Sequence, residues 1–595
     1  KYLSLFSAFI ITFMFSTFDI SVSGIEIFNT VILIYLAYLF IQKQYYQFLL
    51  FSLILVTIAI LFAPGQGGIL LFSIIPLEIY SLYIILKEDM KKSIKFLLIT
   101  LVIYALVIFS SPLFEILYSA ILYAKEQSSL NSITYGIPWY FSINSFANGN
   151  YWLFEIVRSG YIVVIGISLI LIIKYLVNKK INNRKEVLVF TSIILISSML
   201  LIIRGAGRID PGAFSRLGFA TTWIIGVLLP ILLYYLYSKY KFVLISIFIL
   251  FYISTFGYIN NSLSLNNLIL KVNSRTHLPQ SYQYSKNIGI DNLGNGIIEN
   301  NHLIRIRKIK EFLKKVLDKN DTFLNLTNRN ALYFYLNRKP PIETGAFYNL
   351  VSEGQQKRAI KKLTKNIPKI AILEADNLLH DSLKIPLRSP LLYRFVMENY
   401  KPLKIDGIIY GIRNDLINKI KYNLSRENQM KLYDSVFLTQ NLQFIPSEWG
   451  KNFYNIGLNT LKYKDLVHIE TINDLKQIPN GYQINGNDPF IVYRLPNNVS
   501  GNKVSYLSFD FQCLNNFNKI NHFEVYYKGD GMGFSENKVI RFKSKSKKNI
   551  IPMESNPRFY SIKNIDSIRV DLLANSSCET FSINHINLYE KIGEK

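Results

Sequence analysis

Residues 68–86 read GILLFSIIPLEIYSLYIIL, an apolar run whose one charged side chain is Glu78. A helix rises 1.5 Å per residue and the hydrocarbon layer is roughly 30 Å thick, so about twenty such residues cross a membrane. The run ends at a charged segment, KEDMKK at 87–92, which is typical of a loop at the membrane surface. Residues 68–86 therefore predict a transmembrane helix.

Similar runs recur throughout residues 1–260. About nine approach the length of a span, namely 2–18, 25–42, 46–62, 68–86, 95–111, 159–177, 187–203, 217–237 and 241–259. The predicted fold of this part is a polytopic α-helical membrane bundle. The chain starts at Lys1 inside an apolar run, so we expect further helices upstream in a longer protein.

Short loops rich in lysine alternate with loops that are poor in lysine. The first kind lies at 42–44, 87–92, 179–185 and 239–241, and the second at 19–24, 63–68, 112–158 and 204–216. Lysine and arginine concentrate on the cytoplasmic side of membrane proteins, so the first set is predicted to be cytoplasmic. An odd number of spans then places everything after about residue 260 outside the cytoplasm.

Residues 261–435 predict an extracytoplasmic α/β domain. The pattern gives helices at 304–317, 331–336, 353–365 and 391–400, strands at 321–326 and 369–374, and a hairpin at 404–413 around Asp406-Gly407. This segment has neither a glycine-rich phosphate loop nor a nucleophile elbow, so we assign it no catalytic role.

Residues 436–595 predict a β-sandwich of jelly-roll type. Alternating strands at 506–512, 523–527, 567–573 and 581–589 are separated by turn residues. Both cysteines, Cys513 and Cys578, fall here, and the sequence allows either a disulfide in an oxidising compartment or two buried free thiols. Such a module more often binds or packs than catalyses, and carbohydrate is the expected ligand.

The formal net charge is +26. The basic residues are spread over the chain and form no helix with base-reading spacing, which argues against a nucleic-acid partner. Lysines next to a bilayer favour anionic lipids or lipid phosphates instead. The histidines and cysteines have no zinc spacing, so no metal site is assigned, and a divalent metal cofactor stays open.

The loop RGAGRIDPGAFSR at 204–216 is the exception to the charge pattern. It places Arg204, Arg208 and Arg216 on the outer side, with Asp210 among them. Guanidinium groups bind phosphate oxygens in bidentate fashion, so one hypothesis is a phosphate pocket. The alternative is interfacial anchoring of the bundle.

Segment 112–158 is rich in aromatic residues, including Trp139 and Trp152. It predicts either an aromatic belt at the interface or a platform on which a sugar ring stacks. The membrane part has no histidine, so a general base there has to be a carboxylate. The candidates are Asp19, Glu26, Glu78 and Asp210. For Glu78, a role in packing one helix against another is an equal alternative.

Three stretches resemble bacterial membrane glycosyltransferases of the GT-C superfamily. They are RGAGRIDPG at 204–212, the segment 321–341 ending YFYLNRKPP, and LRSPLLYRFVMENYKP at 387–402 leading to DGIIYGIR at 406–413. The resemblance covers much of the chain and implies sugar transfer from a polyprenyl-phosphate carrier to a surface glycan or lipid, at the bacterial inner membrane. That family usually carries its catalytic acid in the first outer loop, where Asp19 and Glu26 lie here without the expected acidic pair.

Other hypotheses compete with sugar transfer by a carboxylate base assisted by Arg204, Arg208 or Arg216. An O-antigen ligase or polymerase also uses outer arginines on a lipid-linked glycan. A non-enzymatic, membrane-anchored glycan-binding or assembly protein needs only the terminal sandwich. A transporter requires polar residues distributed through the spans, and these are scarce.

Overall fold

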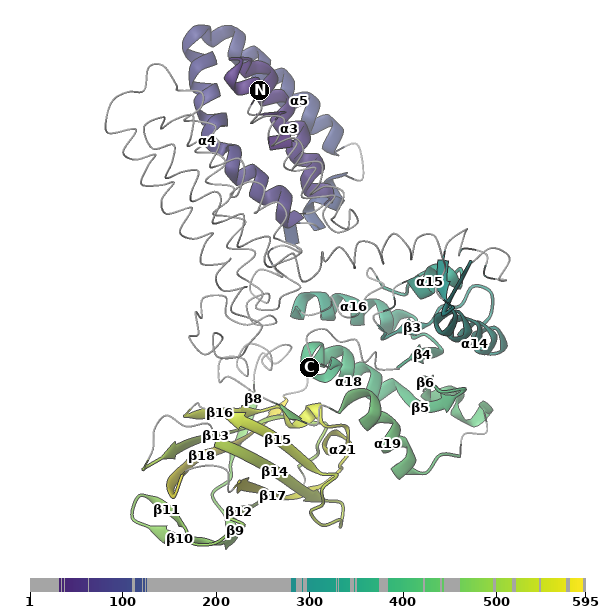
Figure 1. Ribbon diagram of the computed structural model, residues 1–595, viewed down its shortest axis with the longest axis vertical. Coiled ribbons are helices and arrows are strands. Elements are labelled where there is room, and N and C mark those ends of the chain that lie inside the picture. Colours follow the sequence, from purple (N-terminus) through teal and green to yellow (C-terminus); the bar gives the residue numbers. More distant parts are fainter. Residues whose placement is uncertain are drawn as a thin grey trace. The chain divides into compact units, whose positions relative to one another are not determined.

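The structure is a computed structural model (Figure 1) that describes residues 32–125 and 280–591, apart from short interruptions and longer gaps at 374–383 and 443–460. The chain divides into two compact units, Lys1–His277 and Leu278–Lys595. The first contributes helices and the second contains all the described strands.

Three consecutive apolar helices make up most of the described part of the first unit. They are α3 (Tyr45–Phe62), α4 (Pro64–Glu88) and α5 (Met90–Phe109). Residues Leu70–Glu88 and helix α5 are each long and apolar enough to cross a membrane, whereas α3 supplies a shorter apolar segment, Tyr45–Leu61. Spans predicted at 46–62, 68–86 and 95–111 thus coincide with helices. The others lie wholly outside the described residues, except 25–42, which lies partly outside.

The predicted loop at 87–92 is wrong in its extent. Only Asp89 separates α4 from α5, and its carboxylate accepts a hydrogen bond from the backbone N–H of Lys92 at 3.0 Å. Asp89 therefore caps the start of α5, and Lys91 and Lys92 lie in the first turn of that helix. Two polar contacts tie α5 to α3, from Tyr46 to Ser93 and from Thr57 to Tyr104.

The α/β region contains a four-stranded sheet in the order β3-β4-β6-β5, with β3 (Leu324–Asn325), β4 (Ile370–Ile372), β5 (Tyr400–Ile405) and β6 (Ile408–Arg413). Strands β3 and β4 are parallel and the others antiparallel. The predicted hairpin is confirmed. Asp406 and Gly407 have φ values of 50° and 85°. A two-residue turn that matches the right-handed twist of its strands needs positive φ at both residues.

Helices flank this sheet. They are α14 (Asn300–Val316), α15 (Ala331–Tyr335), α16 (Glu353–Lys365), α17 (Ile385–Arg388), α18 (Pro390–Asn399) and α19 (Arg426–Phe437), with a 3-10 helix η5 (Asn414–Ile420) after β6. Helix α16 has the predicted bounds because Ser352 and Gln355 form a capping box at its start. Apolar side chains cover both faces of the sheet, with Tyr393 and Val396 in one cluster and Ile306 and Leu313 in the other.

A two-stranded antiparallel sheet of β1 (Tyr282–Tyr284) and β2 (Ile297–Glu299) precedes α14. The rest of the described part of the second unit is built mainly from two six-stranded sheets. One has the order β10-β11-β18-β13-β16 with β8 also paired to β18, and the other β7-β15-β14-β17-β12-β9. The first comprises β8 (Leu461–Asp465), β10 (Leu475–Ile478), β11 (Gly481–Ile484), β13 (Val504–Cys513), β16 (Lys548–Ile551) and β18 (Thr580–Lys591). The second comprises β7 (Asn441–Leu442), β9 (Ile469–Asn473), β12 (Phe490–Arg494), β14 (Asn521–Gly529), β15 (Val539–Ser544) and β17 (Ile565–Leu572).

The two sheets face one another across an aromatic core. Phe509 and Phe511 of β13 lie with ring centroids 5.6 and 4.9 Å from that of Phe523 on β14, and Phe542 of β15 stacks on Phe523 at 5.0 Å. This β-rich region agrees with the predicted sandwich and contains the four strands expected at 506–512, 523–527, 567–573 and 581–589. A short 3-10 helix η6 (Met553–Ser555) and helix α21 (Pro557–Tyr560) precede β17.

Cys513 at the end of β13 and Cys578 just before β18 are joined in a disulfide, with their Cα atoms 5.7 Å apart. The two strands are direct neighbours, and Cys513 pairs with Phe581 in the register. Of the two arrangements that the sequence allowed, the structure therefore has the bonded one.

Candidate functional site

Most side chains predicted for the membrane site lie outside the described residues. These are Asp19, Glu26, Trp139, Trp152, Arg204, Arg208, Asp210 and Arg216. Glu78 is described and lies half-buried in α4, two residues after Pro76 and within hydrogen-bonding reach of Ser52 on α3. A carboxylate that contacts a hydroxyl on a neighbouring helix fits the packing alternative for Glu78.

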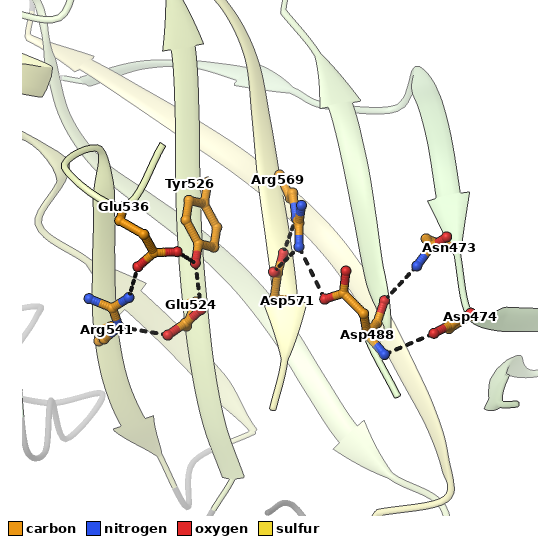
Figure 2. Close-up of polar contacts among 9 residues, drawn as sticks. All are labelled: Asn473, Asp474, Asp488, Glu524, Tyr526, Glu536, Arg541, Arg569 and Asp571. Atoms are coloured by element: carbon orange, nitrogen blue, oxygen red, sulfur yellow. Dashed lines mark hydrogen bonds and ion pairs between the residues drawn. The ribbon is translucent and has the colours of Figure 1, made fainter. Parts of the chain in front are cut away.

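A second group of polar residues lies on the outer face of the sheet β7-β15-β14-β17-β12-β9. Side chains alternate along a strand, so Phe523, Val525 and Tyr527 point into the core while Glu524 and Tyr526 point outward. The strand register places Asp571 beside Glu524 and Arg569 beside Tyr526. We call this group, with Asn473, Asp474, Asp488, Glu536 and Arg541 (Figure 2) and with Phe490, the outer-face cluster.

Arg569 on β17 is the centre of one half of the cluster. Its Nε donates to Asp571 at 2.7 Å and its Nη2 to the other carboxylate oxygen of Asp571 at 2.5 Å, while Nη2 also donates to Asp488 at 3.2 Å. The guanidinium carbon lies 3.7 Å from the ring centroid of Phe490 and 5.1 Å from that of Tyr526. Arg569 is thus held by two carboxylates and by the faces of two aromatic rings.

Tyr526 and Arg541 form the other half with two glutamates. Nε of Arg541 donates to Glu524 at 2.6 Å, and its Nη2 donates to Glu536. The Tyr526 hydroxyl lies 2.8 Å from a carboxylate oxygen of each of the same two glutamates. The four side chains therefore close a ring of polar contacts, in which the one hydroxyl proton of Tyr526 is donated to either Glu524 or Glu536 at a time.

Asp488 is positioned by the turn beside β9. Its backbone N–H donates to the Asp474 carboxylate at 2.8 Å, and its carbonyl oxygen accepts from the Asn473 amide at 2.9 Å. Asp474 has a positive φ of 50°, a conformation that aspartate tolerates better than most residues. These bonds orient Asp488 so that its own carboxylate reaches Arg569.

The electrostatics of the cluster reflect burial and these partners. Burial raises the pKa of Asp571 to about 6, although Arg569 acts in the opposite direction. Hydrogen bonds from Tyr526 and Arg541 lower the pKa of Glu536. Burial, together with the two neighbouring glutamates, raises the pKa of Tyr526. Carboxylates outnumber guanidinium groups in the cluster, so it carries a negative charge on a chain whose formal net charge is +26.

The cluster is partly open to solvent. The side chains of Glu536 and Asp488 are 73% and 63% exposed, and that of Arg541 is 37% exposed, while Asp571 is buried beneath them. The exposed oxygen and nitrogen atoms of Glu536, Asp488 and Arg541 thus lie above the buried Asp571 on the β-sheet. Within the described residues no three His, Cys, Asp or Glu side chains are arranged to hold a metal ion. The arrangement is suited to binding a polar ligand by hydrogen bonds.

The sequence alone does not predict this cluster. The alternation within 523–527 and 567–573 does place Glu524, Tyr526, Arg569 and Asp571 on the polar faces of their strands. The cluster forms only because β14 and β17 are neighbours in the sheet and β12 lies on the other side of β17. Those pairings are long-range and leave no local trace in the sequence.

Comparisons with known proteins identify no family. No protein-family model matches the chain, and no curated protein matches it. One solved structure is similar to part of it, a low-affinity xylan-binding module named CBM86, from the xylanolytic gut symbiont Roseburia intestinalis. It is 10% identical, the match covers 23% of this chain and 97% of the module, and the TM-score is 0.18. The interpretation of the outer-face cluster therefore depends on its own geometry.

Proposed function

We propose that this protein is membrane-anchored and binds carbohydrate through the outer-face cluster. The observation that supports this most directly is the position of Arg569 between the rings of Phe490 and Tyr526, with carboxylates on either side. Adjacent hydroxyls of a sugar form paired hydrogen bonds with carboxylate and guanidinium groups, which present two donors or two acceptors in one plane. The cluster offers both kinds of group on one rigid sheet face.

The charge of the cluster favours a glycan without acidic groups. Arg569 is already neutralised by Asp571 and Asp488, and Arg541 by Glu524 and Glu536. A uronate or phosphate on the ligand would meet uncompensated negative charge, and like charges side by side in an interface oppose binding. Neutral or amine-bearing sugars avoid this repulsion.

Anchoring is supported by the first unit. Apolar side chains of α5, such as Leu98, Val102 and Leu106, are more than half exposed, which suits lipid as the surrounding solvent. We propose the nine-span bundle in the bacterial inner membrane, with its lysine loops in the cytoplasm and the second unit outside. The Cys513–Cys578 disulfide supports placing the second unit outside the cytoplasm, because disulfides persist in oxidising compartments.

The test is binding of purified full-length chain, in detergent or nanodiscs, to immobilised neutral, amine-bearing and acidic glycans. Phe490→Ala and Glu536→Gln should each weaken binding of the preferred glycan about tenfold, the loss expected for roughly 1.4 kcal/mol. Glu353→Gln is the matched control, because it removes an exposed salt-bridge carboxylate on α16, in the α/β region. Absence of binding to every glycan class would exclude the proposed function, whereas the strongest binding to acidic glycans would exclude only the charge argument.

Sugar transfer is the second candidate, and the arginines of the 204–216 loop favour it. In this proposal the membrane part is a GT-C-like enzyme that moves a sugar from a polyprenyl phosphate to a surface acceptor. One of Asp19, Glu26, Glu78 and Asp210 deprotonates the acceptor hydroxyl, and Arg204, Arg208 or Arg216 stabilises the departing lipid phosphate. The terminal sandwich then holds the acceptor glycan. A ligase or polymerase differs in moving a whole chain, which the mass of the product reveals.

A further inference from the structure

The outer face of the sheet β7-β15-β14-β17-β12-β9 continues beyond the outer-face cluster. Lys528 of β14, Ser567 of β17 and Arg494 of β12 are register partners across three neighbouring strands. Lys528 lies two residues after Tyr526, and Ser567 lies two residues before Arg569. Side chains two residues apart on a strand point to the same side of the sheet. These three residues therefore share the outer face with the cluster.

Two further side chains contact this row. Glu470 of β9 accepts a hydrogen bond from Nζ of Lys528 at 3.3 Å and, through its other carboxylate oxygen, one from Oγ of Ser567 at 2.7 Å. Nζ of Lys528 also lies 5.2 Å from the ring centroid of Phe534. We call Glu470, Arg494, Lys528, Phe534 and Ser567 the Lys528 patch. A cation held by a carboxylate and by the face of an aromatic ring thus occurs here, as it does at the centre of the outer-face cluster.

The polar groups of the Lys528 patch are open to solvent. The side chains of Lys528 and Glu470 are 27% and 35% exposed, whereas Ser567 is buried beneath them. Arg494 is exposed, and its guanidinium forms no hydrogen bond with the described part of the chain. The hydrogen bond from Ser567 lowers the pKa of Glu470, and the charges of Lys528 and Arg494 act in the same direction. Arg494 therefore offers its N–H donors near the Glu470 carboxylate.

The Lys528 patch and the outer-face cluster lie at two ends of one surface. Ser567 of the patch and Asp571 of the cluster are both buried and lie four residues apart on β17, which is about 13 Å at 3.3 Å per residue. The loop between β14 and β15 contributes Phe534 to the patch and Glu536 to the cluster. A single pyranose ring is shorter than the distance along β17, so only linked sugars can contact both at once.

We propose that the Lys528 patch is a second sugar subsite and that the ligand is a linear glycan of several sugars, which lies along the strands across both sites. The inference rests on the proposed function, because the outer-face cluster has to bind the first sugar. Glu470 accepts hydrogen bonds from hydroxyls of the second sugar, and Arg494 and Lys528 donate to them. Once the first sugar is bound, a linked second sugar meets the patch at a high effective concentration, so the affinity rises with glycan length.

The first test measures how the affinity depends on glycan length. The probes are linear neutral sugars made of glucose or of N-acetylglucosamine, and linear amine-bearing sugars made of glucosamine, each from the monosaccharide to the hexasaccharide. Their binding to the full-length chain in nanodiscs is measured by titration calorimetry. We expect the affinity of the preferred series to rise about tenfold or more until the glycan spans both subsites, and then to level off. Equal affinity for the monosaccharide and its oligomers would overturn the second subsite and leave the proposed function intact.

The second test removes one cation of the patch at a time. Arg494→Met and Lys528→Met should each lower the ratio of hexasaccharide to monosaccharide affinity about tenfold, the effect of losing one hydrogen bond from a charged group. Phe490→Ala, in the outer-face cluster, should weaken the binding of both ligands. Lys476→Met is the matched control and should keep the wild-type ratio, because Lys476 is an exposed lysine on β10, in the other sheet.

Arg494→Met is the decisive variant. It loses no hydrogen bond within the described part of the chain, so it should fold as the wild type does, which thermal unfolding checks. A ratio equal to that of the wild type in this variant would overturn the second subsite. Absence of binding by every probe at every length would overturn the proposed function as well.

Discussion

Arg394 and Glu554 form an ion pair although they are 160 residues apart, and each side chain is only 3% exposed. Removing two charges from water costs several kcal/mol per ion, and here the cost is offset by a bidentate hydrogen-bonded pair. The contact joins α18 to η6, so the α/β region and the sandwich have charged groups that are satisfied only when the two regions are together.

Breaking this pair should destabilise the second unit strongly. Glu554→Gln leaves the Arg394 guanidinium buried without a counter-charge, and the expected loss is about 3–5 kcal/mol in the free energy of unfolding. The double variant Arg394→Met with Glu554→Leu removes both charges and should recover much of that loss. Chemical denaturation of the three proteins measures the difference. A single variant as stable as the wild type would show that the pair is not formed.

The titration of Asp571 should affect stability with a defined sign. Its folded pKa of about 6 lies above the ordinary value of 3.8. The folded state therefore holds the proton between about pH 4 and 6 while the unfolded chain releases it. The stabilisation that this bound proton gives the folded state is fully present below pH 4. It is lost as the pH rises through 6, which lowers the free energy of unfolding by about 3 kcal/mol. Asp571→Asn lacks the contribution, so its stability relative to the wild type should increase over that window. Parallel pH profiles of the two proteins would contradict the raised pKa.

The disulfide should stabilise the sandwich measurably. It closes a loop with a sequence separation of 65, for which chain entropy predicts about 4 kcal/mol. Dithiothreitol should therefore lower the Tm of the wild type and leave the double variant Cys513→Ala, Cys578→Ala unchanged at its own lower value. Equal Tm values for reduced and oxidised wild type would argue against the bond.

Local signals predicted much of the second unit. Ser352 and Gln355 mark the start of α16 because a capping box involves residues close in sequence. Asp406-Gly407 marks a hairpin because both residues accept positive φ. The Arg394–Glu554 pair and the Arg569–Tyr526 contact could not be predicted, since each depends on which segments become neighbours only after folding. The predicted membrane-site residues are a separate case, because all except Glu78 lie outside the described residues.

Sugar transfer makes a prediction for one arginine. If the 204–216 loop binds lipid phosphate, Arg208→Ala should reduce transfer to an acceptor glycan by about a hundredfold or more, because a positioned cation contributes several kcal/mol to the transition state. Arg208→Lys keeps the charge but not the bidentate geometry, so it should recover only part of the activity. Expression and membrane insertion of both variants are the controls. Undiminished transfer by Arg208→Ala would remove this residue from the mechanism.

Orientation in the membrane can be tested with single cysteines in the background of Cys513→Ala, Cys578→Ala. Lys91→Cys lies at the start of α5, in a segment predicted to be cytoplasmic, and Lys357→Cys lies on the exposed face of α16, in the second unit. A membrane-impermeant maleimide added to intact spheroplasts should label position 357 and spare position 91, and permeabilisation should expose both. The positive-inside rule predicts this result, because lysines resist transfer across the membrane. The reverse labelling would place the outer-face cluster in the cytoplasm, where no surface glycan reaches it and where the Cys513–Cys578 pair would be kept reduced.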